Sequence, residues 1–129
     1  MVAPRSAVNR VVYVVRAHMS LHDVTITAGD HGPHIALSGE IDMAAVESVK
    51  ERMRPTLDEE PAVLVLDLRD VAFLDSSGLR VIFGLAREQT ERGGRLVVVR
   101  GGRRVARVLE LTGADRQLET VDDPAEIRS

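Results

Sequence analysis

Four histidines are the side chains in this sequence that could bind a metal or transfer a proton: His18, His22, His31 and His34. All four lie in the N-terminal arm, in the first predicted strand or beside the turn that follows it. The chain contains no cysteine, and no helical pair of histidines accompanies a glutamate, as in zinc proteases. We therefore interpret the histidines as solvated side chains and expect no metal site.

Two neighbouring hydroxyls, in Asp75-Ser76-Ser77-Gly78, lie where a predicted strand gives way to a predicted helix. The segment is not a Gly-x-Ser-x-Gly elbow, and no base is placed beside either serine, so we expect no hydrolase and no other enzyme activity. One interpretation is structural, with Asp75 or Ser76 capping the helix. The other is phosphorylation, because free N–H groups and the helix dipole favour a dianion there and Arg80 lies one turn on.

A third candidate is Gly101-Gly102 followed by two arginines, which resembles a phosphate-binding loop in composition alone. It lacks the Gly-x-x-x-x-Gly-Lys-Ser/Thr spacing of nucleotide-binding loops, so we expect no nucleotide and no other cofactor. The surrounding arginines admit two interpretations: a solvated face balanced by Glu88, Glu91 and Glu110, or a patch that contacts a partner or an anion. These arginines are Arg95, Arg100, Arg103, Arg104 and Arg107.

The first elements needed to position these groups follow from hydrophobic periodicity. Alternating apolar residues predict strands over 24–28 and 35–39, joined by a turn rich in glycine and proline. A helix capped by Asp42 is then expected. Its predicted core stripe is Met43, Val46, Val49, Met53 and Leu57. The continuous apolar run over 62–66 is typical of a strand covered on both faces, and a turn is expected over 68–70.

The second half of the chain repeats the alternation of helix and strand. The helix after Ser77 has the predicted core stripe Leu79, Ile82, Phe83, Ala86 and Thr90, and ends at Gly93-Gly94. A buried strand over 96–99 follows. A third helix then begins at Gly101-Gly102 and ends at Gly113, with Val105, Val108, Leu109 and Thr112 inward. A short strand over 118–121 and a helical turn after Pro124 complete the prediction, which is an α/β sandwich with a mostly parallel sheet and an antiparallel edge.

Length, charge and composition exclude several classes of function. The chain has 129 residues, enough for one domain, and a net charge of −3. Arg5, Arg10 and Arg16 make residues 1–20 a basic arm, which we expect to be flexible or dispensable. The apolar run over 11–15 is too short for a signal peptide or a membrane span. With so few aromatic residues and a net negative charge, we expect no direct binding of nucleic acid. The short apolar run predicts no membrane insertion, and the absence of cysteine favours a cytoplasmic location.

Motifs in fixed order make residues 22–123 resemble the STAS domain family, in its anti-sigma factor antagonist type. Gly39-Glu40-Ile41-Asp42 is followed by Asp75-Ser76-Ser77-Gly78-Leu79 and then by Leu111-Thr112-Gly113. The resemblance implies a STAS domain over residues 21–129, with a small mixed, mostly parallel sheet of about five strands flanked by three to four helices. The last helix of the family is expected to be short or absent.

The resemblance also implies roles for individual residues. Ser76 aligns with the serine that is phosphorylated in the family, Asp75 with the acid before it, and Asp42 with the acid that closes Gly-Glu-x-Asp. Ser77 and Gly78, together with Arg80, are expected to belong to the same partner-binding or switch region.

The function implied by the resemblance is partner switching in transcription regulation. The unphosphorylated protein would bind an anti-sigma factor serine kinase and release the sigma factor, phosphorylation of Ser76 would end that binding, and a serine phosphatase would be a further partner. The alternative is a STAS scaffold that does not switch, or a subunit of a lipid or anion transport complex.

Overall fold

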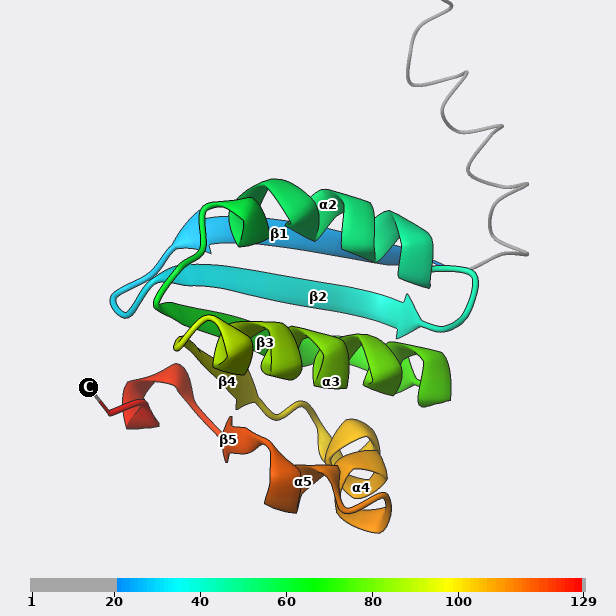
Figure 1. Cartoon of the computed structure of the whole chain (residues 1–129). Helices are drawn as coiled ribbons and strands as arrows, with labels where there is room; N and C mark the ends of the chain where they lie inside the picture. The colour runs from blue at the N-terminus through cyan, green and yellow to red at the C-terminus, as the bar shows by residue number, and fades with distance from the viewer. Residues whose placement is uncertain (1–20, 129) are drawn as a thin grey trace, which may run out of the picture.

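The computed structural model describes residues 21–128, in which five strands and their helices form one α/β unit (Figure 1). The basic arm predicted over residues 1–20 lies outside the described residues. None of the helices within the described part combines the length and the apolar character needed to cross a membrane.

The sheet has the order β1-β2-β3-β4-β5, so every strand lies beside its neighbour in sequence. Strand β1 (His22–Ala28) is antiparallel to β2 (Pro33–Ile41), as the hairpin prediction required. The remaining pairs are parallel. Their strands are β3 (Val63–Leu74), β4 (Arg95–Val99) and β5 (Glu119–Val121). The prediction of a mostly parallel sheet with an antiparallel edge is therefore confirmed.

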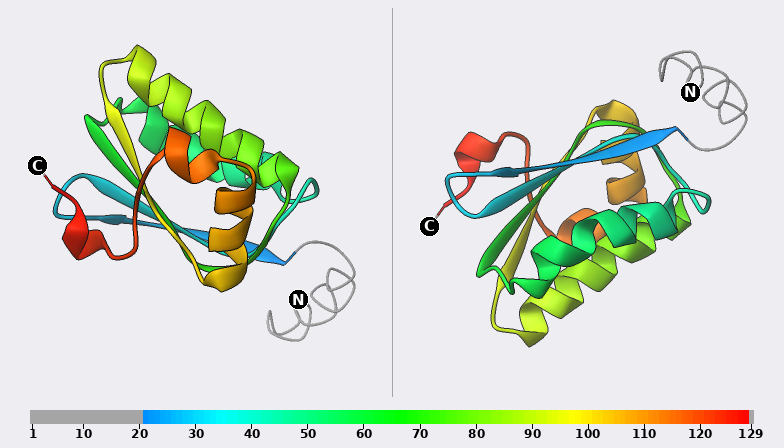
Figure 2. Two further views of the ribbon diagram at one scale, coloured as in Figure 1. Left: turned by 90° about the horizontal axis from the view of Figure 1, so that it is seen from below. Right: turned by 90° about the horizontal axis from the view of Figure 1, so that it is seen from above.

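The helices complete the main core with their apolar faces. They are α2 (Val46–Asp58), α3 (Ser76–Glu91), α4 (Arg103–Leu111) and the short α5 (Ala114–Gln117). Helices α2 and α3 lie side by side over the sheet and begin at the same end of it (Figures 1 and 2). A smaller cluster lies apart from this core, where Val65, Val97 and Val99 contact Ile127, just after the 3-10 turn η1 (Pro124–Glu126).

The turn predicted over 68–70 is wrong, because β3 runs through these residues without interruption. The register of β2 and β3 shifts between the pairs Ala36–Asp67 and Ser38–Asp70. Two residues of β2 thus span three residues of β3, and the extra residue forms a bulge. The polar residues Arg69 and Asp70 made residues 68–70 resemble a turn. The bulge accommodates them, so the strand continues.

The start of α2 also differs from the prediction. The helix begins at Val46 and not at Met43, and the Met43 side chain is 78% exposed. Asp42 does cap, but it caps the turn before α2: its Oδ1 accepts the Ala45 N–H at 3.1 Å, and its carbonyl oxygen accepts the same N–H at 3.0 Å. The predicted core residues Val49, Met53 and Leu57 are buried.

The predicted stripe residues of α3 and α4 pack against the core except at the last positions, and the α3 stripe omits Leu85, which is buried. Thr90 and Thr112 are exposed, and Gln89 is buried in place of Thr90. The buried Gln89 amide is satisfied at one end: its Nε2 donates to the carbonyl oxygens of Pro61 and Arg95, at 3.0 and 3.1 Å, whereas its Oε1 has no hydrogen-bond partner among the described residues. The amide therefore ties the end of α3 to the residues that precede β3 and begin β4.

Candidate functional site

The Asp75 side chain fixes the start of α3. Asp75 has the extended backbone of an N-cap residue, and its Oδ1 accepts the N–H groups of Ser77 and Gly78 at 2.9 and 3.2 Å. The Asp75 N–H in turn donates to the Ile41 carbonyl oxygen at 3.3 Å. The sequence allowed either Asp75 or Ser76 as the cap of this helix. In the structure Asp75 is the cap, and the Ser76 hydroxyl takes no part in it.

Gly78 allows the first turn of α3 to approach the end of β2. A Cβ at this position would lie 2.6 Å from Leu74 Cδ1 and 2.8 Å from the Ile41 carbonyl oxygen, closer than side chains tolerate. Gly78 is also buried, so it contributes to the site through packing. The expected switch region is thus built against the ends of β2 and β3.

Ser76 is the first residue of α3 and its side chain is exposed, whereas Ser77 is half-buried. Arg80 is exposed one turn further along the same helix. No ion pair joins Arg80 to any of the residues that the structure describes. An exposed hydroxyl, the N-terminal end of a 16-residue helix and an unengaged guanidinium therefore lie within one turn.

The first turn of α3 also carries no acidic side chain. A phosphoryl group on Ser76 would meet the positive end of the helix dipole, but it would lie beside the Asp75 carboxylate, which already accepts the N–H groups of Ser77 and Gly78. One turn of helix separates the Ser76 position from Arg80, the i,i+4 spacing at which oppositely charged side chains interact. Arg80 is therefore the basic side chain of α3 whose spacing suits pairing with an anion at position 76.

Asp42 reaches the site from the neighbouring strand. It follows the last residue of β2, Ile41, whose carbonyl oxygen receives the Asp75 N–H. The structure thus brings the two acidic motifs, some 30 residues apart in sequence, to one end of the sheet. It also places Met43, which the periodicity assigned to the core, on the surface next to them.

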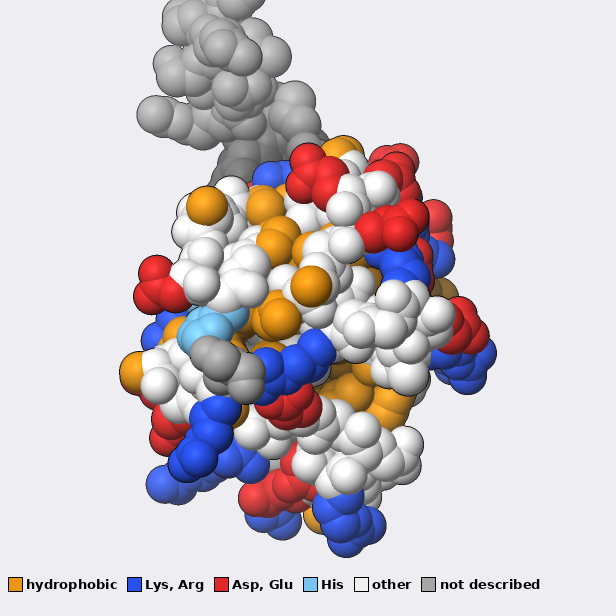
Figure 3. All heavy atoms as spheres, turned by 60° about the vertical axis from the view of Figure 1, so that its left-hand side comes forward, with side chains coloured by type: hydrophobic (Ala, Val, Ile, Leu, Met, Phe, Trp, Pro, Cys, Tyr) orange, Lys and Arg blue, Asp and Glu red, His pale blue; other side chains and the backbone are white. Residues whose placement is uncertain are grey.

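Two arginines of the predicted cluster pair with acids, whereas Arg103, Arg104 and Arg107 on α4 are exposed and form no ion pair with a described residue. Arg95 Nε donates to Glu119 at 2.7 Å and Arg100 Nε donates to Asp122 at 2.9 Å, so β5 and its loop supply the acids. The predicted balance by Glu88 is wrong, because Glu88 pairs with Arg54 and Arg92. Lys and Arg side chains are interspersed with Asp and Glu side chains over the side of the molecule shown in Figure 3.

One histidine was misinterpreted as a loop residue. His34 lies in β2, and its Nε2 is 2.8 Å from Oδ2 of the buried Asp67, which also pairs with Arg69. Burial alone would raise the pKa of Asp67, but the hydrogen bonds from the Arg69 side chain and backbone and from His34 outweigh it and lower this pKa. The group is an ion-paired part of the sheet, and neither Ser76 nor Asp75 takes part in it.

Within residues 21–128, no three His, Asp or Glu side chains converge as a metal centre would require. The His31 and His34 side chains lie beside a shallow cavity of about 430 Å³ formed with the residues around η1.

Comparison with known proteins agrees with the motifs. The sequence model of the STAS domain matches residues 25–127. The anti-sigma-B factor antagonist of Bacillus subtilis is 30% identical over 91 residues, which are 70% of this chain and 83% of that protein. An anti-sigma factor antagonist from Mycobacterium paratuberculosis has a similar structure, with a TM-score of 0.72 at 24% identity over 82% of this chain and 90% of that one. The Bacillus cell fate determinant SpoIIAA in its phosphorylated form gives a TM-score of 0.60 at 19% identity, over 80% of this chain and 95% of that one.

Proposed function

The chain belongs to the STAS domain family, in its anti-sigma factor antagonist type, and on this basis we propose that it is a phosphorylation-controlled antagonist of an anti-sigma factor. In its unphosphorylated form it binds an anti-sigma factor serine kinase and releases the sigma factor. Phosphorylation of Ser76 ends the binding, and a serine phosphatase restores it.

The observation that carries this proposal is the exposed Ser76 hydroxyl at the first position of α3. Asp75 already caps the helix, so Ser76 has no structural task that phosphorylation would interrupt. SpoIIAA, a Bacillus protein with the same fold, has been solved in a phosphorylated form, which supports a modifiable residue in proteins of this type.

Phosphorylation acts through charge at the contact surface. It adds about −1.5 to −2 charges at neutral pH. At the edge of a protein interface this charge loses water when the partner binds, and it repels any acidic group that the partner places near Asp42 or Asp75. The fold tolerates the phosphate because Ser76 is exposed and takes no part in the cap, and because Arg80 lies one turn further along the helix. The modification therefore removes binding without removing the fold.

Phosphorylation in vitro tests the assignment to Ser76. The kinase to use is the anti-sigma factor serine kinase whose gene lies nearest to the gene of this protein. We expect it to transfer one phosphoryl group from ATP to the Ser76 hydroxyl. Tryptic mass spectrometry would locate the group, and Ser77→Ala, a matched loss of the neighbouring hydroxyl, should still accept one equivalent. Label on Ser77, or stoichiometric labelling of Ser76→Ala, would exclude Ser76 and favour a STAS scaffold that does not switch.

A further inference from the structure

Helices α2 and α3 leave a groove between them that begins beside the Ser76 site. Its volume is about 510 Å³, and Ser77 and Arg80 form part of its wall. Its apolar lining is Met43, Val46, Met53, Leu57, Val81 and Leu85. Met43 is the most exposed large hydrophobic side chain among the described residues, at 78%. An exposed apolar side chain at the mouth of an apolar groove is typical of a contact surface.

Gly84 keeps this groove open. It lies in the interior of α3, where glycine is less favourable than alanine for helix stability. No structural requirement for glycine is present: its backbone does not adopt a positive φ, and a Cβ would meet nothing within 4 Å. By contrast, Gly78 on the same helix has no room for a Cβ. A glycine that costs helix stability without a packing reason indicates that the space above it is used by something else.

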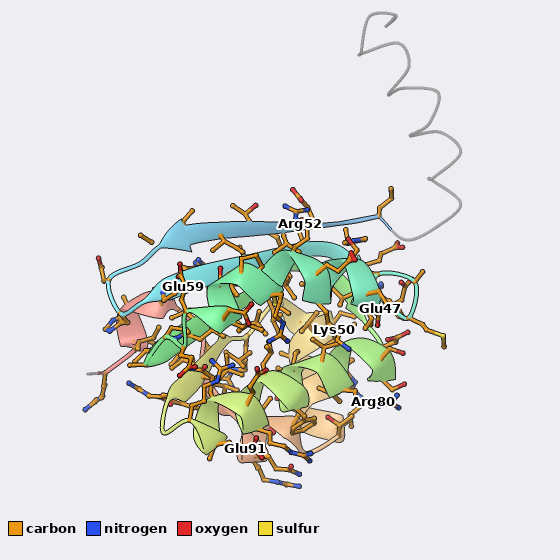
Figure 4. All side chains as sticks on the ribbon, turned by 45° about the horizontal axis from the view of Figure 1, so that its top comes forward. Glu47, Lys50, Arg52, Glu59, Arg80 and Glu91 are labelled. Atoms are coloured by element: carbon orange, nitrogen blue, oxygen red, sulfur yellow. The ribbon has the colours of Figure 1, made fainter. Side chains whose placement is uncertain are left out.

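The charges around the groove differ between its two ends. Arg54 of α2 and Glu88 of α3 bridge the far end with an N–O distance of 3.2 Å. At the end near Ser77, Glu47 and Lys50 of α2 and Arg80 of α3 lie close to the start of both helices (Figure 4). Lys50 and Glu47 are only loosely paired at 3.8 Å, and no described residue pairs with Arg80. Asp42 and Asp75 also lie at this end, so its distinctive feature is not a net charge but Arg80, a guanidinium in the groove wall that pairs with no described acid.

We propose that this groove binds an amphipathic helix of the anti-sigma factor, with an apolar side chain inserted above Gly84 and an acidic side chain beside Arg80. The proposal rests on the proposed function and extends it to a second contact region. Apolar anchors flanked by complementary charge are the usual way in which a helix binds a groove. The groove and Ser76 would then form one continuous surface.

This arrangement also explains how a phosphate on Ser76 could act beyond simple repulsion. Arg80 lies four residues after Ser76, the spacing at which a helix brings oppositely charged side chains together. A phosphoserine would compete for the same guanidinium that the acidic side chain of the partner needs. Phosphorylation would then weaken the groove contact as well as the contact at Ser76 itself.

Filling the groove tests the proposal. Gly84→Leu should weaken binding of the anti-sigma factor serine kinase encoded nearest to the gene by about tenfold or more, measured by calorimetric titration of the unphosphorylated full chain. Because leucine favours the helix, the melting temperature should stay equal or rise. Loss of affinity in a protein that is no less stable would not be explained by misfolding.

The control is Thr90→Leu, which adds an apolar side chain to an exposed position of α3 that does not line the groove, and which should bind like the wild type. Wild-type affinity in Gly84→Leu, or an equal loss of affinity in both variants, would refute binding of the partner in the groove.

Arg80→Gln should weaken binding of the kinase about threefold or more; unchanged affinity would refute the contact between Arg80 and an acidic side chain. If the wild-type protein does not bind the kinase, the proposed function is wrong. If Ser76→Asp abolishes binding and Gly84→Leu does not weaken it, only the groove proposal is wrong.

Discussion

Gly78 controls how closely the start of α3 packs against the end of β2. Gly78→Ala should destabilise the fold by about 1 to 3 kcal/mol, because the added methyl group would lie 2.6 Å from Leu74 Cδ1 and 2.8 Å from the Ile41 carbonyl oxygen. Urea unfolding at neutral pH measures the change. Gly84→Ala is the matched control, because open space surrounds that position. There the higher helix propensity of alanine should raise the free energy of unfolding by up to about 1 kcal/mol. Equal effects from the two substitutions would show that the packing argument is wrong.

Single residues of the site could be predicted from the sequence where local chemistry decides them. The Asp-Ser-Ser-Gly segment contains both the cap and the hydroxyl, and the structure keeps Ser76 exposed next to the capping Asp75. The exposure of Met43 could not be predicted, because the spacing of apolar residues predicts a helix but not the residue at which it begins. Asp42 caps a separate turn before α2, so Met43 lies outside the helix and is exposed.

At the scale of elements, β3 depends on a buried charge. Asp67 is 5% exposed and hydrogen-bonds the Arg69 side chain and His34. These bonds lower the pKa of Asp67 below its unfolded value, despite the opposing effect of burial. Its contribution to stability is therefore complete above the unfolded pKa and is lost as the pH falls through the lower folded pKa.

Asp67→Asn should accordingly destabilise the fold at pH 7 by about 1.5 to 3 kcal/mol, the range for hydrogen bonds to charged groups. The difference from the wild type should shrink as the pH falls below about 4, because the Asp67 carboxylate of the unfolded chain then takes up a proton while the folded one, with its lower pKa, does so only at lower pH. Urea denaturation between pH 7 and pH 3 measures this dependence. Asp70→Asn, at an exposed position of the same strand, should have little effect at either pH. A constant gap between Asp67→Asn and the wild type would contradict the ion-pair account.

The order and type of the elements were predictable, but their ends were less so. Alternating apolar residues predicted β1 and β2, and continuous apolar runs predicted β3 and β4, because the pattern of apolar residues reflects burial on one or both faces. The polar residues of β3 resembled a turn because the bulge that accommodates them depends on the register with β2, which is non-local. Burial of Gln89 likewise depends on carbonyl oxygens before β3 and within β4 that no local pattern shows.

For the whole molecule, residues 1–20 are the segment whose contribution to folding is still a prediction. Leu21 is the first described residue, and its carbonyl oxygen accepts the Glu40 N–H at 2.7 Å, which anchors the start of β1. Deleting residues 1–18 preserves this contact. The deletion should shift the melting temperature by less than about 4 °C, the shift that about 1 kcal/mol produces in a domain of this size. A larger fall, measured by circular dichroism, would make the arm part of the fold.

The central claim is that one charge at the start of α3 decides partner binding while the fold persists. The most direct measurement is calorimetric titration of Ser76→Ala and Ser76→Asp against the purified anti-sigma factor serine kinase, with circular dichroism to verify folding. Ser76→Ala should bind like the unphosphorylated wild type, since Asp75 and not Ser76 caps the helix. Ser76→Asp should lose about thirtyfold or more in affinity, corresponding to about 2 kcal/mol or more for a charge placed at an interface. Equal dissociation constants for two folded variants would contradict the switch.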